Sequence, residues 1–268
     1  MCGSTNLIKK DGVFVCQSCG TQYSVEEAKK MMVEGTIDVK GTVKVDTSDE
    51  LKNLYEIARR AKDSDNSENA AKYYDMILSK DPQSWEANFY VVYFKAKSCK
   101  IGQIYSESKN LCNSMNSVFL LVKNSITEEN EQKKVVEELS SRYSSIANTF
   151  FSVAKSHIKN NNSNLLSDAS ESIEILYKLG DSLDMEFGGK YSELSTNAWK
   201  NAIEFNNEFL KYTLSPSQEK ERMRECFQKI VRYDESYQAP AFKTPLWVYA
   251  VAIGVITIIF MVAMIGSI

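Results

Sequence analysis

The chain has 268 residues, of which 43% are apolar and 25% are charged, and its formal net charge is −3. This composition is typical of a globular protein with a sizeable core. The slightly negative charge excludes a global basic field, so nucleic acid or an anionic membrane would have to bind a local patch. Only 11 glycines and 4 prolines interrupt the chain, which favours a helical fold over a β-sandwich or barrel.

Residues 1–23 have the pattern of a small metal-binding ribbon. Cys16 and Cys19 form a C-x-x-C-G turn with Gly20, in which two thiolates can face one tetrahedral ion. Asp11-Gly12 lies between two apolar runs and predicts a β-hairpin. No apolar secretory signal precedes this region, so we expect the body to stay in the reducing cytosol, where cysteines act as metal ligands or core residues.

This stretch resembles the zinc ribbon of the transcription factor IIB type, which begins many bacterial proteins. Such ribbons carry two C-x-x-C-G knuckles, and the resemblance implies that Cys2, Cys16 and Cys19 are three of four Zn²⁺ ligands. The fourth ligand would stand three residues before Cys2, upstream of Met1, so we expect a start codon placed too far downstream. The alternatives are a water molecule, the Met1 amine, a ligand from a second chain, or His157.

The other candidate ligands are isolated within helical patterns. His157 is the single histidine, and we interpret it as a packed or half-exposed helical residue. Cys99, Cys112 and Cys226 have no partner at ligand spacing, so we interpret them as small core side chains.

Residues 24–48 are predicted to link the ribbon to the rest of the chain. Ser24 and Glu27 form a capping box that starts a short helix, which runs to Glu34 and is stopped by Gly35. From Thr36 to Val45 apolar and polar residues alternate, which predicts an extended strand or small hairpin.

Residues 49–235 are predicted to form an all-helical body that begins with two helices, Asp49–Lys62 and Ser67–Lys80. Residues 51–84 match one tetratricopeptide repeat at the following positions: Leu54, Ile57, Ala58, Ala70, Tyr74 and Pro82. The segment from Trp85 could open a second repeat. Because a solenoid needs about three repeats to bury a continuous core, we expect this pair to pack on the later helices.

From Ile101 the apolar spacing is helical throughout. We expect four long helices: one of about thirty residues capped by Thr127, one from Leu165 to Met185 closed by Gly188-Gly189, one over Tyr191–Phe209, and one from a Ser215-Pro216 cap to about Asp234. Their aromatic stripes are interpreted as core packing rather than as ligand pockets.

Residues 236–245 are predicted to be a juxtamembrane tether, and residues 246–268 a transmembrane anchor. Leu246–Ile265 has no charge in twenty residues, enough to span a bilayer core of roughly 30 Å. Trp247 and Tyr249 would lie at headgroup level, and basic residues precede the segment while none follows it. The expected topology is a single-pass protein of the cell membrane with its body in the cytoplasm.

The whole pattern resembles bacterial zinc-ribbon membrane proteins with a tetratricopeptide-like helical region. The residues that carry the resemblance are VCQSCGTQYSVEEAKK, GTVKVD, AAKYYDMIL, DPQSWEA and YDESYQAP before the apolar end. The resemblance implies a mainly α fold with a small β zinc ribbon, and it supplies no activity.

We expect no enzyme, because the chain lacks the Walker, G-x-S-x-G and H-E-x-x-H motifs and has one histidine. Residues 1–48 hold six lysines against six acidic residues, so phosphate attraction is not expected there. The sequence therefore predicts a membrane-tethered cytoplasmic adaptor that binds a protein partner. The alternative is a membrane-bound, transcription-related regulator whose ribbon binds nucleic acid, and the salt dependence of DNA affinity distinguishes the two.

Overall fold

The computed structural model describes residues 7–10, 12–17, 19–27, 48–158 and 164–265. The chain divides into two compact units, residues 1–48 and residues 49–268. The described residues are mainly helical, with a small antiparallel sheet in the first unit. The predicted fold class is confirmed at this level.

The first unit contains a three-stranded sheet in the order β1 (Leu7–Lys10), β2 (Val13–Cys16) and β3 (Gln22–Tyr23). In the antiparallel β1–β2 pair, Leu7 lies opposite Cys16 and Lys10 lies opposite Val13. Gly12 in the connection has φ +88°, a left-handed conformation that glycine adopts without steric cost. The predicted hairpin is confirmed, whereas β3 was not predicted because two residues carry no periodic signal.

The predicted capping box at the end of the first unit is also confirmed. The Ser24 amide donates to Glu27 Oε2 at 2.9 Å, and the Glu27 amide donates to Ser24 Oγ at 3.2 Å. Residues 25–27 are helical. The remainder of the predicted helix and the predicted strand over 36–45 lie outside the described residues.

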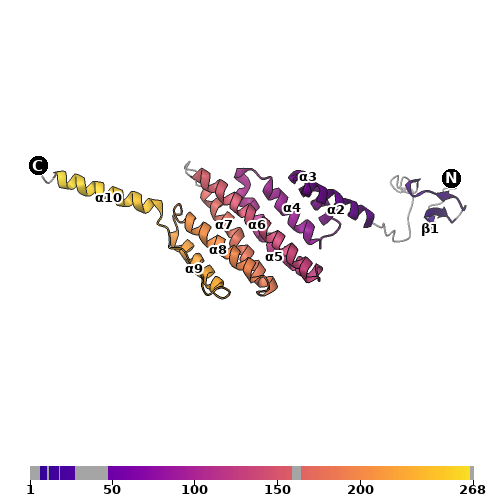
Figure 1. Cartoon of the computed structure of the whole chain (residues 1–268). Coiled ribbons are helices and arrows are strands. Elements are labelled where there is room, and N and C mark those ends of the chain that lie inside the picture. Colours follow the sequence, from indigo (N-terminus) through magenta and orange to yellow (C-terminus); the bar gives the residue numbers. More distant parts are fainter. Residues whose placement is uncertain (1–6, 11, 18, 28–47, 159–163, 266–268) are drawn as a thin grey trace. The chain divides into compact units, whose positions relative to one another are not determined.

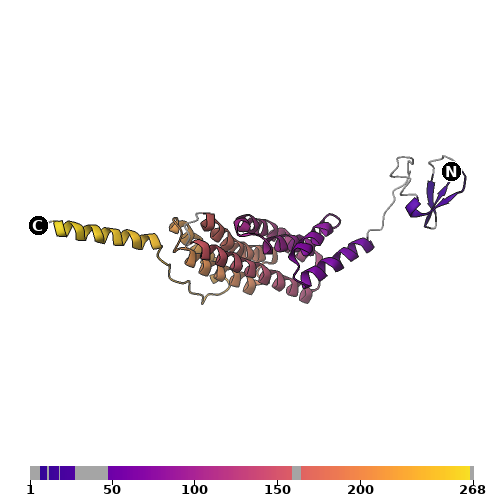
Figure 2. The same ribbon diagram turned by 90° about the horizontal axis from the view of Figure 1, so that it is seen from above.

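In the second unit, α2 to α9 form a stack of helices (Figures 1 and 2) whose buried apolar side chains share one core, to which the described residues of α10 contribute nothing. Helix α7 packs against α5, α6 and α8, and α4 packs against both α3 and α5. The helices are α2 (Ser48–Asp63), α3 (Ser67–Leu78), α4 (Trp85–Lys97), η1 (Ile101–Gln103), α5 (Ile104–Ser125), α6 (Glu129–Ile158), α7 (Asn164–Phe187), α8 (Ser192–Phe209), α9 (Pro216–Val231) and α10 (Leu246–Ile265).

The tetratricopeptide-like section joins this core, as predicted. Leu54 and Ala58 of α2 and Ala70 and Tyr74 of α3 are buried with residues of the later helices. Ile57 is 38% exposed, so its predicted place in the packing is wrong. The arrangement is consistent with a helical-repeat-like fold.

Two predicted helix caps differ from the structure. The cap of α6 is Glu128 rather than Thr127, because the Glu128 carboxylate accepts from the amides of Asn130 and Glu131 at 3.0 and 2.5 Å. Pro216 occupies the first turn of α9 as predicted. Ser215 is at the N-cap position, but its side chain accepts no capping hydrogen bond from the helix. The glycine stop is confirmed, since Gly188 and Gly189 have φ +56° and +86°.

Helix α10 covers the predicted anchor from Leu246 to Ile265, and it contains no acidic or basic residue in its first or last turn. Its side chains are described as far as Ile258. Among the described residues, no helix is long and apolar enough to cross a membrane.

Candidate functional site

Cys16 and Cys19 lie at C-x-x-C spacing on a tight turn that ends at Gly20. Cys16 is the last residue of β2 and is 1% exposed, whereas Cys19 is exposed. The Gly20 amide donates to the Cys16 carbonyl at 2.8 Å, and the Cys16 amide donates to the Thr21 carbonyl at 2.9 Å. Gly20 has φ +72°, so a residue with a Cβ would be strained there. These two backbone bonds and the left-handed Gly20 close a tight turn that carries both cysteines.

Cys2, the third predicted ligand, lies outside the described residues. Among the residues that the structure does describe, no group of three or more cysteine, histidine or acidic side chains could hold a metal ion. The two described cysteines nevertheless fit the chemistry of zinc, since they follow one another at C-x-x-C spacing on a tight glycine turn.

The remaining cysteines have the structural role predicted for them. Cys112 and Cys226 are buried in the helical core, and Cys99 packs against its edge. Burial raises the pKa of both core thiols to about 12, which keeps them protonated at neutral pH and unsuited to bind metal. His157 is half-buried on α6, as predicted, with Nδ1 2.9 Å from the Val153 carbonyl oxygen.

A buried carboxylate at the start of α4 was not predicted. Glu86 is 7% exposed and accepts from Arg59 Nε at 3.0 Å, from Arg59 Nη2 at 2.6 Å, and from the Tyr74 hydroxyl at 2.7 Å. Burial and the nearby Glu86 charge raise the pKa of Tyr74, so its hydroxyl stays a donor. This network joins α2, α3 and α4, and its satisfied hydrogen bonds indicate a structural role.

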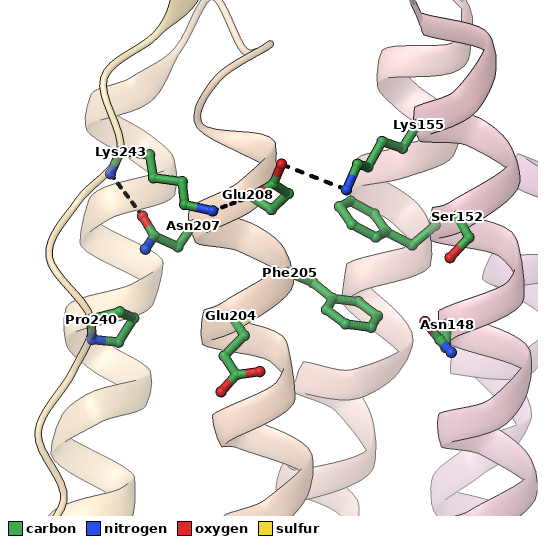
Figure 3. A pocket seen from close by; sticks show the side chains of 10 residues that line it. Asn148, Ser152, Lys155, Glu204, Phe205, Asn207, Glu208, Pro240 and Lys243 are labelled. Carbon is green, nitrogen blue, oxygen red and sulfur yellow. Dashed lines mark hydrogen bonds and ion pairs between the residues drawn. The ribbon is translucent and has the colours of Figure 1, made fainter.

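An open pocket of about 480 Å³ lies between α6, α8 and the segment before α10 (Figure 3). Phe151 and Phe205 stack at 4.8 Å between ring centroids in its wall. The other lining residues are polar or small: Asn148, Ser152, Lys155, Glu204, Asn207, Glu208, Pro240 and Lys243.

Glu208 holds the charged groups of this pocket together. Its carboxylate pairs with Lys211 at 2.8 Å, with Lys155 at 3.5 Å, and with Lys243. Burial alone would raise the pKa of Glu208, but hydrogen bonds from Lys211 and Lys243 and the charge of Lys155 lower it to about 2. The cluster joins α6, α8 and the chain before α10 (Figure 3).

Asn207 attaches the segment before α10 to the body (Figure 3). Its side chain is buried and donates through Nδ2 to the Ala241 carbonyl at 2.9 Å, while Oδ1 accepts from the Lys243 amide at 2.9 Å. The Leu246 amide then donates to the Lys211 carbonyl at 2.9 Å. Residues 241–246, called the strap below, are therefore held along the end of α8, although the sequence predicted a simple tether.

Comparison of the chain with protein-family models, with curated proteins and with solved structures finds no match.

Proposed function

We propose that the protein is a non-enzymatic adaptor tethered to the cell membrane by residues 246–268, with a cytoplasmic body that binds a protein partner. The zinc ribbon of residues 1–23 and the helical body supply separate surfaces for that partner. The observation that carries the proposal is the exposure of apolar side chains on every side of α10.

From Leu246 to Ile258, every described side chain of α10 is exposed except Gly254, which is intermediate. A helix that is apolar all round is not stable in water and requires an apolar environment. The described side chains of α10 end at Ile258, but in the sequence the charge-free segment continues to Ile265. A helix of that full length, at about 1.5 Å per residue, would reach across a hydrocarbon core of roughly 30 Å. Trp247 and Tyr249 stand in its first turn, where amphipathic rings suit a membrane interface.

Two features support a zinc-dependent ribbon. Among the described residues of the first unit, the buried cluster is Phe14 and Cys16, with Tyr23 and Val25 against it, and a bound metal would add stability to a cluster of this size. The knuckle turn presents Cys16 and Cys19 at zinc spacing. A bound Zn²⁺ would supply folding free energy rather than catalysis, with Cys2 as a third ligand.

The division of the chain supports a scaffold. The ribbon unit and the helical unit are separate compact bodies, each with its own buried cluster, so the chain can present two surfaces at once. The neutral charge of residues 1–48 favours a protein partner over nucleic acid.

Alkaline extraction of membranes tests the anchor. We expect the full chain to stay in the pellet after carbonate washing, because α10 is inserted, and a variant that ends at Pro245 to appear in the supernatant. Release of the full chain under these conditions would contradict the anchor.

Crosslinking followed by detergent purification tests the adaptor role and its alternative. We expect a protein that crosslinks to the full chain and is lost from the Cys16→Ser variant, while both remain in the membrane fraction. Recovery of nucleic acid that dissociates steeply as salt rises would favour the transcription-related regulator instead.

A further inference from the structure

The strap fixes which part of the body lies next to the start of α10. Leu246 is bonded to Lys211 at the end of α8, and Asn207 and Glu208 hold Ala241 and Lys243. Pro245 is buried immediately before α10. The α8–α9 loop and the first turns of α9 therefore lie beside the first residue of α10.

Basic side chains from distant parts of the sequence gather at this end. Lys220 and Arg224 of α9 lie 5.4 and 5.5 Å from the ring of Phe242 in the strap. Lys211, Lys243 and Lys155 surround Glu208. In the ion pairs of the described residues, these five basic groups have two carboxylate partners, Glu208 and Glu221. The other carboxylates of this part of α9 are Glu219, which pairs with Arg222, and Glu225.

Exposed apolar side chains stand among these cations. Leu214, three residues after Lys211, is 77% exposed, which exceeds the value of every other large apolar side chain in the described part of the chain. Phe242 is 39% exposed. A side chain this exposed is not packed against the body, and an apolar side chain in a segment that also carries Lys211 and Lys220 suits a surface that inserts into the lipid headgroup region.

We propose that the end of the body formed by Lys211, Leu214, Lys220, Arg224, Phe242 and Lys243, called the juxtamembrane face, docks on the anionic phospholipid headgroups of the bilayer that holds α10. The inference rests on the proposed anchor and adds a defined contact between body and membrane. Charge complementarity with anionic lipid and direct continuity with α10 identify the bilayer as the occupant. Leu214 enters the interface, and the lysines and Arg224 contact phosphates.

Photocrosslinking in vesicles tests this contact with the full chain. Benzoylphenylalanine replaces Leu214, which follows the C-terminal end of α8, or replaces Met185 as the matched control. Met185 is 59% exposed and lies in the last turn of α7, which precedes the N-terminal end of α8. We expect phospholipid adducts at position 214 and none at position 185 in phosphatidylcholine vesicles containing phosphatidylglycerol. Without phosphatidylglycerol, the adduct at position 214 should largely disappear.

Charge variants show whether the basic residues cause the contact. Each basic residue near an anionic surface contributes roughly a fivefold change in the docking equilibrium, so the triple variant K211Q/K220Q/R224Q should lower docking by on the order of a hundredfold. Lys155 and Lys243 still pair with Glu208 in that variant. The control K52Q/K72Q/K109Q removes the same charge from exposed positions elsewhere and should leave the adduct unchanged.

The outcomes separate this inference from the proposed anchor. If the chain resists carbonate extraction but forms no adduct at position 214, the juxtamembrane face is overturned and the anchor stands. An adduct that forms equally on neutral vesicles and in the triple variant also overturns the face, because proximity alone would explain it. A chain that is washed from both kinds of vesicle overturns the anchor together with the face.

Discussion

Glu86 links three helices through a carboxylate that water barely reaches. Replacing it by alanine leaves the Tyr74 hydroxyl, which is fully buried, and Arg59 without their acceptor. Because the Arg59 side chain is 56% exposed, water offsets part of the loss, and we expect the free energy of unfolding to fall by about 2 kcal/mol.

Thermal or urea unfolding of the full chain in detergent measures this change. Glu68→Ala, at an exposed position of α3, serves as the control and should change the free energy of unfolding by less than about 0.5 kcal/mol. Equal effects of the two substitutions would show that the Glu86 network adds nothing to stability.

Glu208 should make the strap sensitive to acid. Its pKa is about 2 in the folded chain, below the ordinary value of 4.5, so its ion pairs are fully stabilising above about pH 4.5 and are lost as the pH falls toward 2. We expect residues 241–246 to exchange amide hydrogens faster in Glu208→Gln than in the native chain at neutral pH, and the difference to shrink on acidification.

The exposed Glu225→Gln substitution on α9 is the control for this comparison and should behave as the native chain does at each pH. A difference between native and Glu208→Gln chains that is absent at neutral pH, or that persists undiminished toward pH 2, would contradict the role of Glu208 in holding the strap.

At the scale of elements, the contact between α7 and α8 depends on a glycine. A Cβ on Gly180 would overlap the indole ring of Trp199, the largest fully buried side chain among the described residues. Alanine has the better helix propensity, by about 1 kcal/mol, but the overlap forces the ring to move. We expect Gly180→Ala to destabilise the body by about 1–3 kcal/mol.

A matched substitution separates propensity from packing. Asn201→Ala, exposed on α8, gains helix propensity without a clash, so its melting temperature should stay equal to or above that of the native chain. Gly180→Ala should melt below both. If Gly180→Ala proves as stable as Asn201→Ala, the claim that Trp199 packs too closely on Gly180 to admit a Cβ is contradicted.

Local sequence signals predicted the elements well and their long-range partners poorly. The helical period, the Asp-Gly turn and the Gly188-Gly189 stop act within a few residues, so the helices and the hairpin followed from the sequence. The cap at Glu128 was missed because glutamate caps a helix less often than the neighbouring threonine does. The polar side chains that matter most, Glu86 and Asn207, meet partners 27 and 34 residues away in the chain, and no local pattern identifies such pairs.

The candidate site was predicted only at the knuckle. Cys16, Cys19 and Gly20 form a motif with its own spacing, so its turn could be expected from sequence. The gathering of Lys155, Lys211 and Lys243 around Glu208 depends on how α6, α8 and the strap pack. Lys211 follows Glu208 by three residues, so this pair is local. Lys155 and Lys243 come from α6 and the strap, and no pattern along the sequence places them beside Glu208.

At the scale of the whole molecule, the ribbon and the helical body should respond to metal independently, because their buried clusters share no residue. We expect Cys16→Ser and Cys19→Ser to lower the zinc content measured by elemental analysis, and the helical signal and its melting temperature to remain unchanged. Cys99→Ser, at the edge of the helical core, is the control and should retain the zinc. Zinc that survives loss of Cys16, or a chelator that melts the helices, would contradict this separation.

The central claim is that α10 holds the body at the cytoplasmic side of the membrane, and protease protection in spheroplasts tests it most directly. With a tag at the N-terminus, we expect protease added outside intact spheroplasts to leave the tag and the helical body uncut, and the same protease to remove the tag after the membrane is lysed. Removal of the tag from intact spheroplasts would contradict the predicted topology.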